Sequence, residues 1–125
     1  MQIIGTGLDV VEHERIARAI ERFGARILAR IFTQSEQDYC QSQRNPAPHF
    51  AARFAAKEAL AKALGCGIGE KLRWRDIEVV RGENGAPAIR LHGLGAQRAK
   101  ERGVREIHLS LTHGRDFAAA SVLCL

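Results

Sequence analysis

The longest uninterrupted helical pattern in the chain runs from His49 to Leu64. Every residue in it is compatible with a helix, seven are alanine, and no glycine or proline interrupts it. Pro46 and Pro48 suit the first turn of a helix, and Gly65 suits a C-terminal cap. On a helical wheel most of the alanines form one broad band of small side chains. Such a band lets another element approach closely, so we expect this helix to be the centre of the fold.

Alternation of apolar and polar residues predicts strands around this helix. The predicted strands cover residues 2–8, 76–81, 88–91, 106–112 and 117–123. The first strand has Gly5 and Gly7 on one face, where another element must come close. Glu83-Asn84-Gly85 is a strong turn signal between the second and third strands. The pattern predicts an α+β fold, an antiparallel sheet packed on a long central helix, in one domain over residues 1–125.

Asp9, which follows the first predicted strand, has two interpretations. Asp9-Val10-Val11-Glu12 has the form of a helix N-cap followed by an acid at the third helical position. A carboxylate at the end of a strand, beside two glycines, is also a common place for a ligand site. The residue pattern alone does not decide between them.

The helical pattern from Glu14 to Arg30 is strongly basic, and Gly24 divides it. Spacings of three, four and four residues place four arginines along one stripe. They are Arg15, Arg18, Arg22 and Arg26. A solvated face is the usual explanation for such a stripe, but the acids here are few and mostly offset. Docking of an acidic partner is therefore the alternative interpretation. A capping box at residues 33–36 predicts a short helix to about Cys40, and residues 95–102 predict another.

Glu58 is the unusual residue of the long helix. Its helical neighbours include Phe54 one turn back and Lys62 one turn ahead, so the carboxylate is partly desolvated and needs a cation nearby to stay charged. The simple explanation is an i,i+4 pair with Lys62, which contributes about 0.3 kcal/mol. Arg53 and Lys57 add positive charge on the same helix. One acid among bases on a rigid helix also suits a metal ion with bound phosphates.

Composition limits the classes of function. The chain has 125 residues, a net charge of +5 and a pI near 9.6, which implies an anionic partner or substrate. Its three cysteines are widely spaced and form no CxxC pair, so we expect ordinary thiols in a reducing compartment. No apolar run is long enough to span a bilayer, and no leader pattern opens the chain. We therefore expect a cytoplasmic protein without membrane contact.

Three separated segments together resemble one protein family. They are Gly7-Leu8-Asp9-Val10-Val11-Glu12 with Arg15-Ile16, Arg53-Phe54-Ala55-Ala56-Lys57-Glu58-Ala59 with Lys62-Ala63-Leu64-Gly65, and Ser110-Leu111-Thr112-His113. The first is similar to a Gly-x-Asp opening motif, the second to a Lys-Glu-Ala helix and the third to a Ser-x-Ser/Thr-His strand. The family is the 4′-phosphopantetheinyl transferases, and the length and motif order match the small holo-acyl-carrier-protein synthase type. The resemblance covers essentially the whole chain.

The resemblance implies an enzyme that moves 4′-phosphopantetheine from coenzyme A to a serine of apo-acyl carrier protein, with Mg²⁺, and releases adenosine 3′,5′-bisphosphate. By the motif match, Asp9 and Glu58 are the expected metal ligands, and Mg²⁺ does accept one or two carboxylates plus substrate phosphates. Catalytic roles are expected for Glu58, for Lys62 on a phosphate oxygen, and for His113 on a phosphate or a proton. A structural histidine at a turn is the alternative for His113. The predicted coenzyme A contacts are Arg53, Lys57, Lys62, Gly65, Gly67 and His113.

The resemblance also implies the partners. The carrier protein is acidic in this interpretation, and Arg15 and Arg22 are predicted to meet it. A homotrimer with active sites between subunits is expected. The general base stays open among a metal-bound water, Glu58 and Asp38.

Two other functions stay open. A basic nucleic-acid-binding module agrees with the pI, but the chain has only seven aromatic residues and no RNP-like, zinc-finger or helix-turn-helix pattern. We therefore expect no nucleic-acid partner. A small protein that binds coenzyme A without chemistry is the other alternative.

Overall fold

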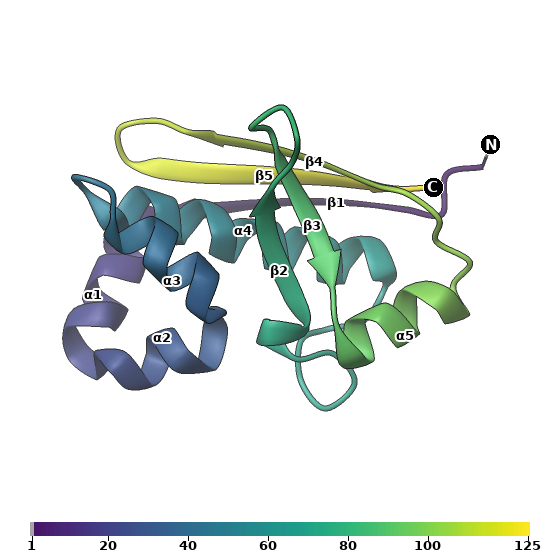
Figure 1. Ribbon diagram of the computed structural model, residues 1–125, viewed down its shortest axis with the longest axis horizontal. Helices are drawn as coiled ribbons and strands as arrows, with labels where there is room; N and C mark the ends of the chain where they lie inside the picture. The colour runs from purple at the N-terminus through teal and green to yellow at the C-terminus, as the bar shows by residue number, and fades with distance from the viewer. Residues whose placement is uncertain (1) are drawn as a thin grey trace.

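A computed structural model describes residues 2–125 and confirms the predicted α+β fold (Figure 1). Its elements are β1 (Gly5–Glu12), α1 (His13–Phe23), α2 (Ala25–Ile31), α3 (Gln34–Gln41), α4 (Pro46–Leu64), a 3-10 turn η1 (Trp74–Asp76), β2 (Ile77–Arg81), β3 (Pro87–Leu91), α5 (Gly93–Glu101), β4 (Ile107–His113) and β5 (Phe117–Cys124). None of the helices in residues 2–125 has both the length and the apolar composition of a membrane span.

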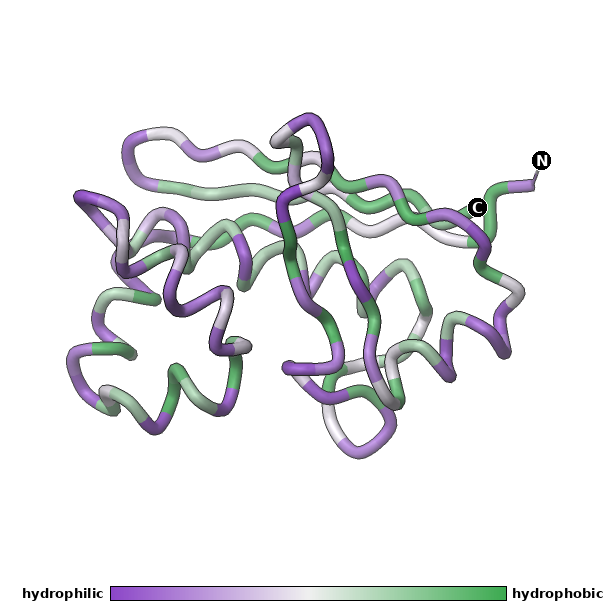
Figure 2. The backbone as a smooth tube through the Cα atoms, in the orientation of Figure 1, coloured by the Kyte–Doolittle hydropathy of each residue, from purple (hydrophilic) through white to green (hydrophobic). Residues whose placement is uncertain are grey.

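The strands form two antiparallel sheets, so the single predicted sheet is divided. One has the order β1-β5-β4, and the other is the β2-β3 hairpin. In Figure 1 the three-stranded sheet lies along one side of α4, with α1–α3 at one end of the molecule and α5 at the other. Figure 2 shows hydrophobic and hydrophilic residues alternating around α1 and α2, as expected of helices with one covered side.

The alanine band of α4 and the two glycines of β1 allow helix and sheet to approach closely, as predicted. A Cβ atom on Gly5 would lie 1.9 Å from the carbonyl oxygen of Ala63, and one on Gly7 would lie 1.8 Å from that of Ala59. Neither position has room for any side chain. Gly65 ends α4 in the left-handed conformation, at φ 73°, which confirms the predicted cap.

Asp9 is not a helix cap, so that interpretation was wrong. β1 continues to Glu12, α1 begins at His13, and Asp9 pairs with Ala120 in the middle of the β1–β5 ladder. The segment has the two-residue period of a strand, because Val10 is 57% exposed and Val11 is 2% exposed. Pairing along the whole of β5 therefore outweighs the local cap signal.

One face of the three-stranded sheet carries no covering element in Figure 1, because α4 lies on the other face. Large apolar side chains stand on this open face, where Leu8 is 64%, Val10 57% and Phe117 50% exposed. Exposed apolar side chains gathered on one face are typical of a surface that another molecule covers.

Candidate active site between β1 and α4

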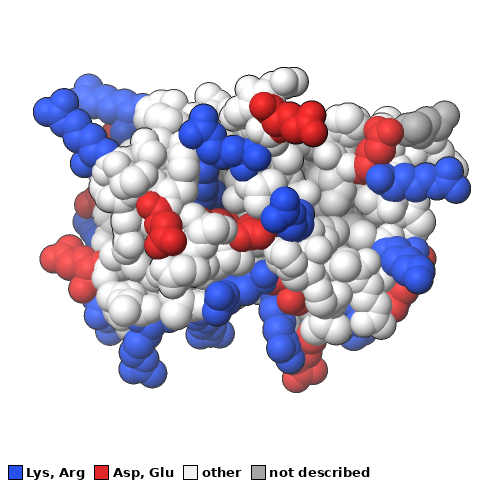
Figure 3. All heavy atoms as spheres, in the orientation of Figure 1, with Lys and Arg blue, Asp and Glu red and all other residues white. Residues whose placement is uncertain are grey.

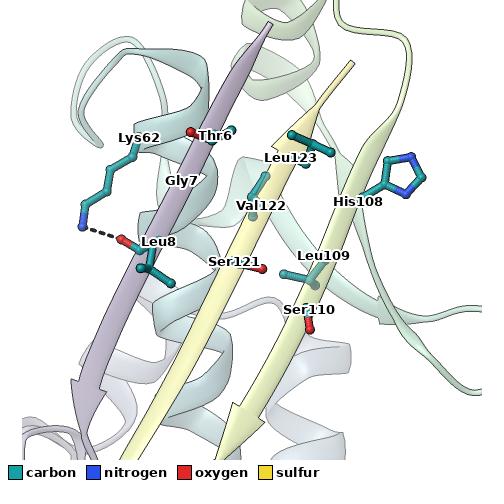
Figure 4. Close-up of a pocket in the computed structure, with 10 residues that line it drawn as sticks. All are labelled: Thr6, Gly7, Leu8, Lys62, His108, Leu109, Ser110, Ser121, Val122 and Leu123. Carbon is teal, nitrogen blue, oxygen red and sulfur yellow. Dashed lines mark hydrogen bonds between the residues drawn. The ribbon is translucent and has the colours of Figure 1, made fainter. Parts of the chain in front are cut away.

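Other elements of the fold cover α4 from Phe50 to Leu64 except at one opening. From Phe50 to Leu64 every residue is buried except Glu58 and Lys62, which lie one turn apart on the same side of the helix. β1 runs beside this opening and brings Asp9 to it. Lys62 donates a hydrogen bond from Nζ to Oδ1 of Asp9 at 3.0 Å. It donates another to the carbonyl oxygen of Leu8 at 2.9 Å (Figure 4). The structure thus brings together three of the predicted site residues.

The two carboxylates act on each other electrostatically. Burial raises the pKa of Glu58 above its ordinary value of 4.5, and the Asp9 carboxylate raises it further, while Lys62 and Arg15 oppose the rise. A second cation between the carboxylates would stabilise the ionised form of Glu58. Arg15 also lies 5.3 Å from the centre of the Phe54 ring, so its guanidinium group is held beside the turn that precedes Glu58.

The donor set suits a hard divalent cation. Asp9 and Glu58 offer carboxylate oxygens, and residues 2–125 contain no cluster of three or more histidine, cysteine or acidic residues that could form a closed metal cage. Mg²⁺ needs only one or two protein carboxylates because it keeps several waters and takes further oxygens from substrate phosphates. Burial and the Asp9 carboxylate raise the pKa of Glu58, and a bound cation would offset the repulsion between the two carboxylates.

Lys57 does not belong to this site, and its predicted contact with coenzyme A was wrong. Its side chain is 0% exposed, and Nζ donates to Oε1 of Glu36 at 2.7 Å and to the carbonyl oxygens of Ile31, Trp74 and Ile77 at 2.9, 3.1 and 2.6 Å. An ammonium group has three hydrogens, and all of them are engaged by these acceptors. Lys57 therefore holds the core together and has no hydrogen free for a phosphate.

Arg53 lies in a second polar region, near the beginning of α4. It is 7% exposed, and its guanidinium group lies 4.3 Å from the centre of the Tyr39 ring. Nη1 donates to the carbonyl oxygen of His49 at 3.3 Å, but the buried Nε has no partner in residues 2–125. Arg53 lines a hollow of about 280 Å³ together with Arg81, Arg90 and one carboxylate, that of Glu78. A buried donor without an acceptor, beside two further cations, is a site suited to an anion.

His113 ends β4 beside two other histidines. The centre of its ring lies 5.5 Å from that of His49 and 6.3 Å from that of His13, whose buried Nε2 also lacks a partner in the described chain. Burial lowers the pKa of His49, and Arg53 and His113 lower it further. In register, His113 and Val11 face each other across β5, so about two strand spacings, or 10 Å, separate His113 from β1. Within one chain, His113 therefore belongs to the polar region around Arg53 and not to the site around Asp9.

The remaining predicted residues lie on the surface. Gly67 is in the loop after α4, and a Cβ atom there would meet nothing within 4 Å, so this glycine is not required for packing. Arg15 and Arg22 are exposed on α1. Asp38 is exposed on α3, where Oδ1 accepts a hydrogen bond from Gln34 at 2.8 Å.

A further hollow of about 530 Å³ follows the open face of the three-stranded sheet, from Lys62 beside β1 to His108 on β4 (Figure 4). It adjoins the Asp9–Lys62 pair, and its lining includes three consecutive residues of each strand, 6–8 on β1, 121–123 on β5 and 108–110 on β4. The active-site opening of α4 therefore continues onto the open sheet face.

Residues 5–122 match the family model described as the 4′-phosphopantetheinyl transferase superfamily. The chain belongs to this superfamily. It is 50% identical over 121 residues, 97% of each chain, to a holo-[acyl-carrier-protein] synthase from Koribacter versatilis. It is 46% identical over 125 residues, 100% of this chain and 99% of the relative, to the protein of that name from Chlamydia caviae.

Solved structures of the superfamily share the whole architecture. The holo-[acyl-carrier-protein] synthase from Neisseria meningitidis superposes with a TM-score of 0.91 at 32% identity, covering 99% of both chains. The synthase from Helicobacter pylori in complex with coenzyme A gives 0.85 at 31% identity, covering 96% of this chain and 99% of that one.

Sequence reasoning about this transferase chain missed the groups that surround Arg53 and His113. Tyr39, His49 and His13 carried no motif, because they come from α3, α4 and α1 and meet only in the folded chain. The burial of Lys57 was also missed, since its partner Glu36 is 21 residues away. The capping box that contains Glu36 was the one available signal of order in that segment.

Proposed function

We propose that this protein transfers 4′-phosphopantetheine from coenzyme A to a serine of apo-acyl carrier protein. The observation that carries the proposal is the pair of carboxylates, Asp9 and Glu58, beside Lys62 at the one opening of α4. The names of the relatives and the coenzyme A complex of the Helicobacter pylori synthase support the substrate and donor.

In the proposed reaction the serine oxygen forms a bond to the β-phosphorus of coenzyme A, and the bond from that phosphorus to the bridging oxygen breaks. Adenosine 3′,5′-bisphosphate leaves, and the serine proton passes to a base or solvent. Asp9 and Glu58 would hold Mg²⁺, which supplies neutralisation of the pyrophosphate charge. Lys62 is already within 3.0 Å of Asp9, so its ammonium group would place a positive charge on a phosphate oxygen beside the metal site.

We infer that Arg53 and His113 receive another phosphate of coenzyme A. The unpaired Nε of Arg53 and the three neighbouring imidazoles support an anion at this place. Because His113 lies across β5 from β1, we propose that one subunit contributes Asp9, Glu58 and Lys62 while His113 comes from the next subunit. Gly65 and Gly67 stay candidates for contacts to the same ligand.

The subunit proposal rests on the open sheet face. We propose a homotrimer in which this face, with Leu8, Val10 and Phe117, is covered by two further copies of the chain. Light scattering coupled to size exclusion tests it. A charge in the centre of the face, Val10→Lys, should give monomers, whereas Ala96→Glu on the exposed side of α5 should leave trimers. A monomeric unsubstituted protein with full activity would disprove the trimer.

We also propose that the acidic carrier protein docks on α1, where Arg15 and Arg22 are exposed, and on the adjoining α2. We propose further that the protein acts in the cytoplasm. The cytoplasmic location is supported by the free thiols of Cys40, Cys66 and Cys124, which are typical of a reducing compartment.

The decisive experiment is to incubate the protein with apo-acyl carrier protein, coenzyme A and Mg²⁺ and to record the intact mass of the carrier. A gain equal to phosphopantetheine, absent with EDTA, is the expected result. Glu58→Gln should lower kcat at least about a thousandfold while the fold is retained, because it removes a charge from the metal site. Glu101→Gln, on the exposed surface of α5, is the matched control. No transfer by the unsubstituted protein to a competent carrier would leave a coenzyme A binder.

A further inference from the structure

A hollow beside α2 is not used by the proposed chemistry. It measures about 560 Å³ and is lined by side chains from α2, η1, β2 and the residue before α5. The lining residues are Arg30, Thr33, Arg73, Arg75, Asp76, Glu78 and His92. Three arginines from two separate parts of the fold therefore face one space.

The carboxylates in this hollow are already satisfied by other groups. Oε2 of Glu78 accepts hydrogen bonds from Thr33 at 2.8 Å and Ser35 at 2.6 Å, and Oε1 lies 3.0 Å from Nε2 of His92. Burial acts to raise the pKa of Glu78, but these hydrogen bonds outweigh it and bring the pKa to about 2. Oδ2 of Asp76 accepts the backbone N–H of Arg73 at 3.0 Å. Neither acid forms an ion pair with an arginine of the hollow.

The arginines themselves lack partners. Arg30, Arg73 and Arg75 are exposed, and none of them takes part in an ion pair within residues 2–125. The lining carries these three cations against the two carboxylates of Glu78 and Asp76, so the hollow keeps a net positive charge and its guanidinium groups can pair with anionic groups from another molecule. The hollow is therefore complementary to carboxylates or other anionic groups.

The hollow is continuous with the surface of α2. Arg30 also lines a neighbouring hollow of about 470 Å³ with Phe23, Arg26 and Ile27, and Phe23 is 52% exposed. In Figure 3, Lys and Arg gather along the lower edge of the molecule, where Figure 1 places α2 and the segment before β2. An apolar patch ringed by unpaired arginines suits an acidic protein better than a small anion.

An aromatic bridge joins this region to the active site. Trp74, between Arg73 and Arg75, packs on Phe54 with ring centres 4.9 Å apart, and Arg15 covers Phe54 from α1. Phe54 precedes Glu58 by one helical turn. A protein lying on α1 and α2 would therefore pass over Phe54 and Trp74 and meet Arg73 and Arg75 beyond them.

We propose that Arg30, Arg73 and Arg75 form a second contact for the acidic carrier protein. The carrier would then extend beyond α1 and α2 onto the segment before β2. The proposal rests on the proposed transferase function. It commits to carboxylate side chains of the carrier as the groups that enter the hollow.

The test is the charge-reversed pair Arg73→Glu/Arg75→Glu, compared with Lys100→Glu/Arg105→Glu. The control pair changes net charge equally and consists of exposed cations that line a separate hollow by α5. We measure the Kd for apo-carrier without coenzyme A, and the KM for each substrate. Reversal at Arg73 and Arg75 should raise the Kd and the KM for the carrier at least about tenfold at low salt, with the KM for coenzyme A within about twofold.

A Kd that stays within about twofold of the control pair overturns the proposal, because only net charge would then matter. Should the reversed pair fold poorly, Arg73→Gln/Arg75→Gln carries the same test with a smaller expected rise. If the reversed pair leaves the Kd for the carrier unchanged but no longer copurifies with nucleic acid that the unsubstituted protein retains, the hollow binds nucleic acid and the proposal is wrong. A failure of the proposed transferase function gives a different result from a failure of this docking proposal. The unsubstituted protein would then bind the carrier but transfer no phosphopantetheine to it.

Discussion

Replacing Lys57 by methionine separates a buried structural cation from the cations of the active site. The change keeps most of the side-chain volume but removes the ammonium group that contacts Glu36 and three backbone carbonyl oxygens. Glu36 is 2% exposed and would keep only the N–H groups of Thr33 and Val79. A buried carboxylate is then left without its counter-ion.

The expected cost follows from that geometry. Breaking a fully buried ion pair costs about 3–5 kcal/mol, because the remaining charge is desolvated and unpaired. A domain of this size has about 5–15 kcal/mol of stability in total, so Lys57→Met is expected to be close to the limit of folding. Glu36→Gln in the same chain removes the orphaned charge, and the double variant should recover at least about 1 kcal/mol.

The assay is urea unfolding, followed by circular dichroism at one protein concentration, because assembly would make stability depend on concentration. Lys62→Met is the contrasting variant, since the Lys62–Asp9 pair has side chains that are 53% and 18% exposed. Lys62→Met should change the free energy of unfolding by less than about 1 kcal/mol while transfer activity falls. For Lys57→Met the KM for coenzyme A should not change. A loss of coenzyme A binding with full stability would refute the structural role of Lys57.

Three other changes test the packing and the electrostatics. Gly7→Ala should lower the free energy of unfolding in urea by at least about 2 kcal/mol, because its Cβ would overlap the carbonyl oxygen of Ala59. Gly67→Ala is the control and should be neutral, because a Cβ there lies in open space. Equal effects of the two substitutions would contradict the close approach of β1 and α4. Because the pKa of Glu58 is raised in the folded state, protonation of Glu58 stabilises the folded state over the unfolded state. This contribution is lost as pH rises through the raised pKa. Glu58→Gln should therefore be at least as stable as the unsubstituted protein at pH 8, and the two should converge near pH 4; a less stable variant at pH 8 would count against the desolvation of Glu58. Because protons and Mg²⁺ would compete for Glu58, the Mg²⁺ concentration that gives half-maximal transfer should rise as pH drops through a value above 4.5. A half-maximal concentration that does not change with pH would argue against Glu58 as a metal ligand.

Local pattern was sufficient for the elements but not for the place where β1 ends. The capping box at Thr33, the cap at Gly65 and the close approach at Gly5 and Gly7 were all predicted, because each depends on a few neighbouring residues. The first strand was predicted to end at residue 8, before Asp9, because the segment that follows satisfies both a cap and a strand pattern. The choice is made by β5, more than 100 residues later, through the pairing of Asp9 with Ala120.

The roles of the α4 residues were harder to predict because this helix is covered on nearly every side. A helix with one buried face reveals that face by its period, but α4 carries buried residues all around from Phe50 to Leu64. Lys57 and Glu58 are adjacent in sequence and point about 100° apart, so one enters the core and the other reaches the opening beside β1. The sequence shows two adjacent charged residues, whichever of them is buried in the folded chain. Only the positions of Glu36 on α3 and Asp9 on β1 assign one charge to the core and the other to the site, which is why Asp9, Glu58 and Lys62 are the residues on which the proposed transfer depends.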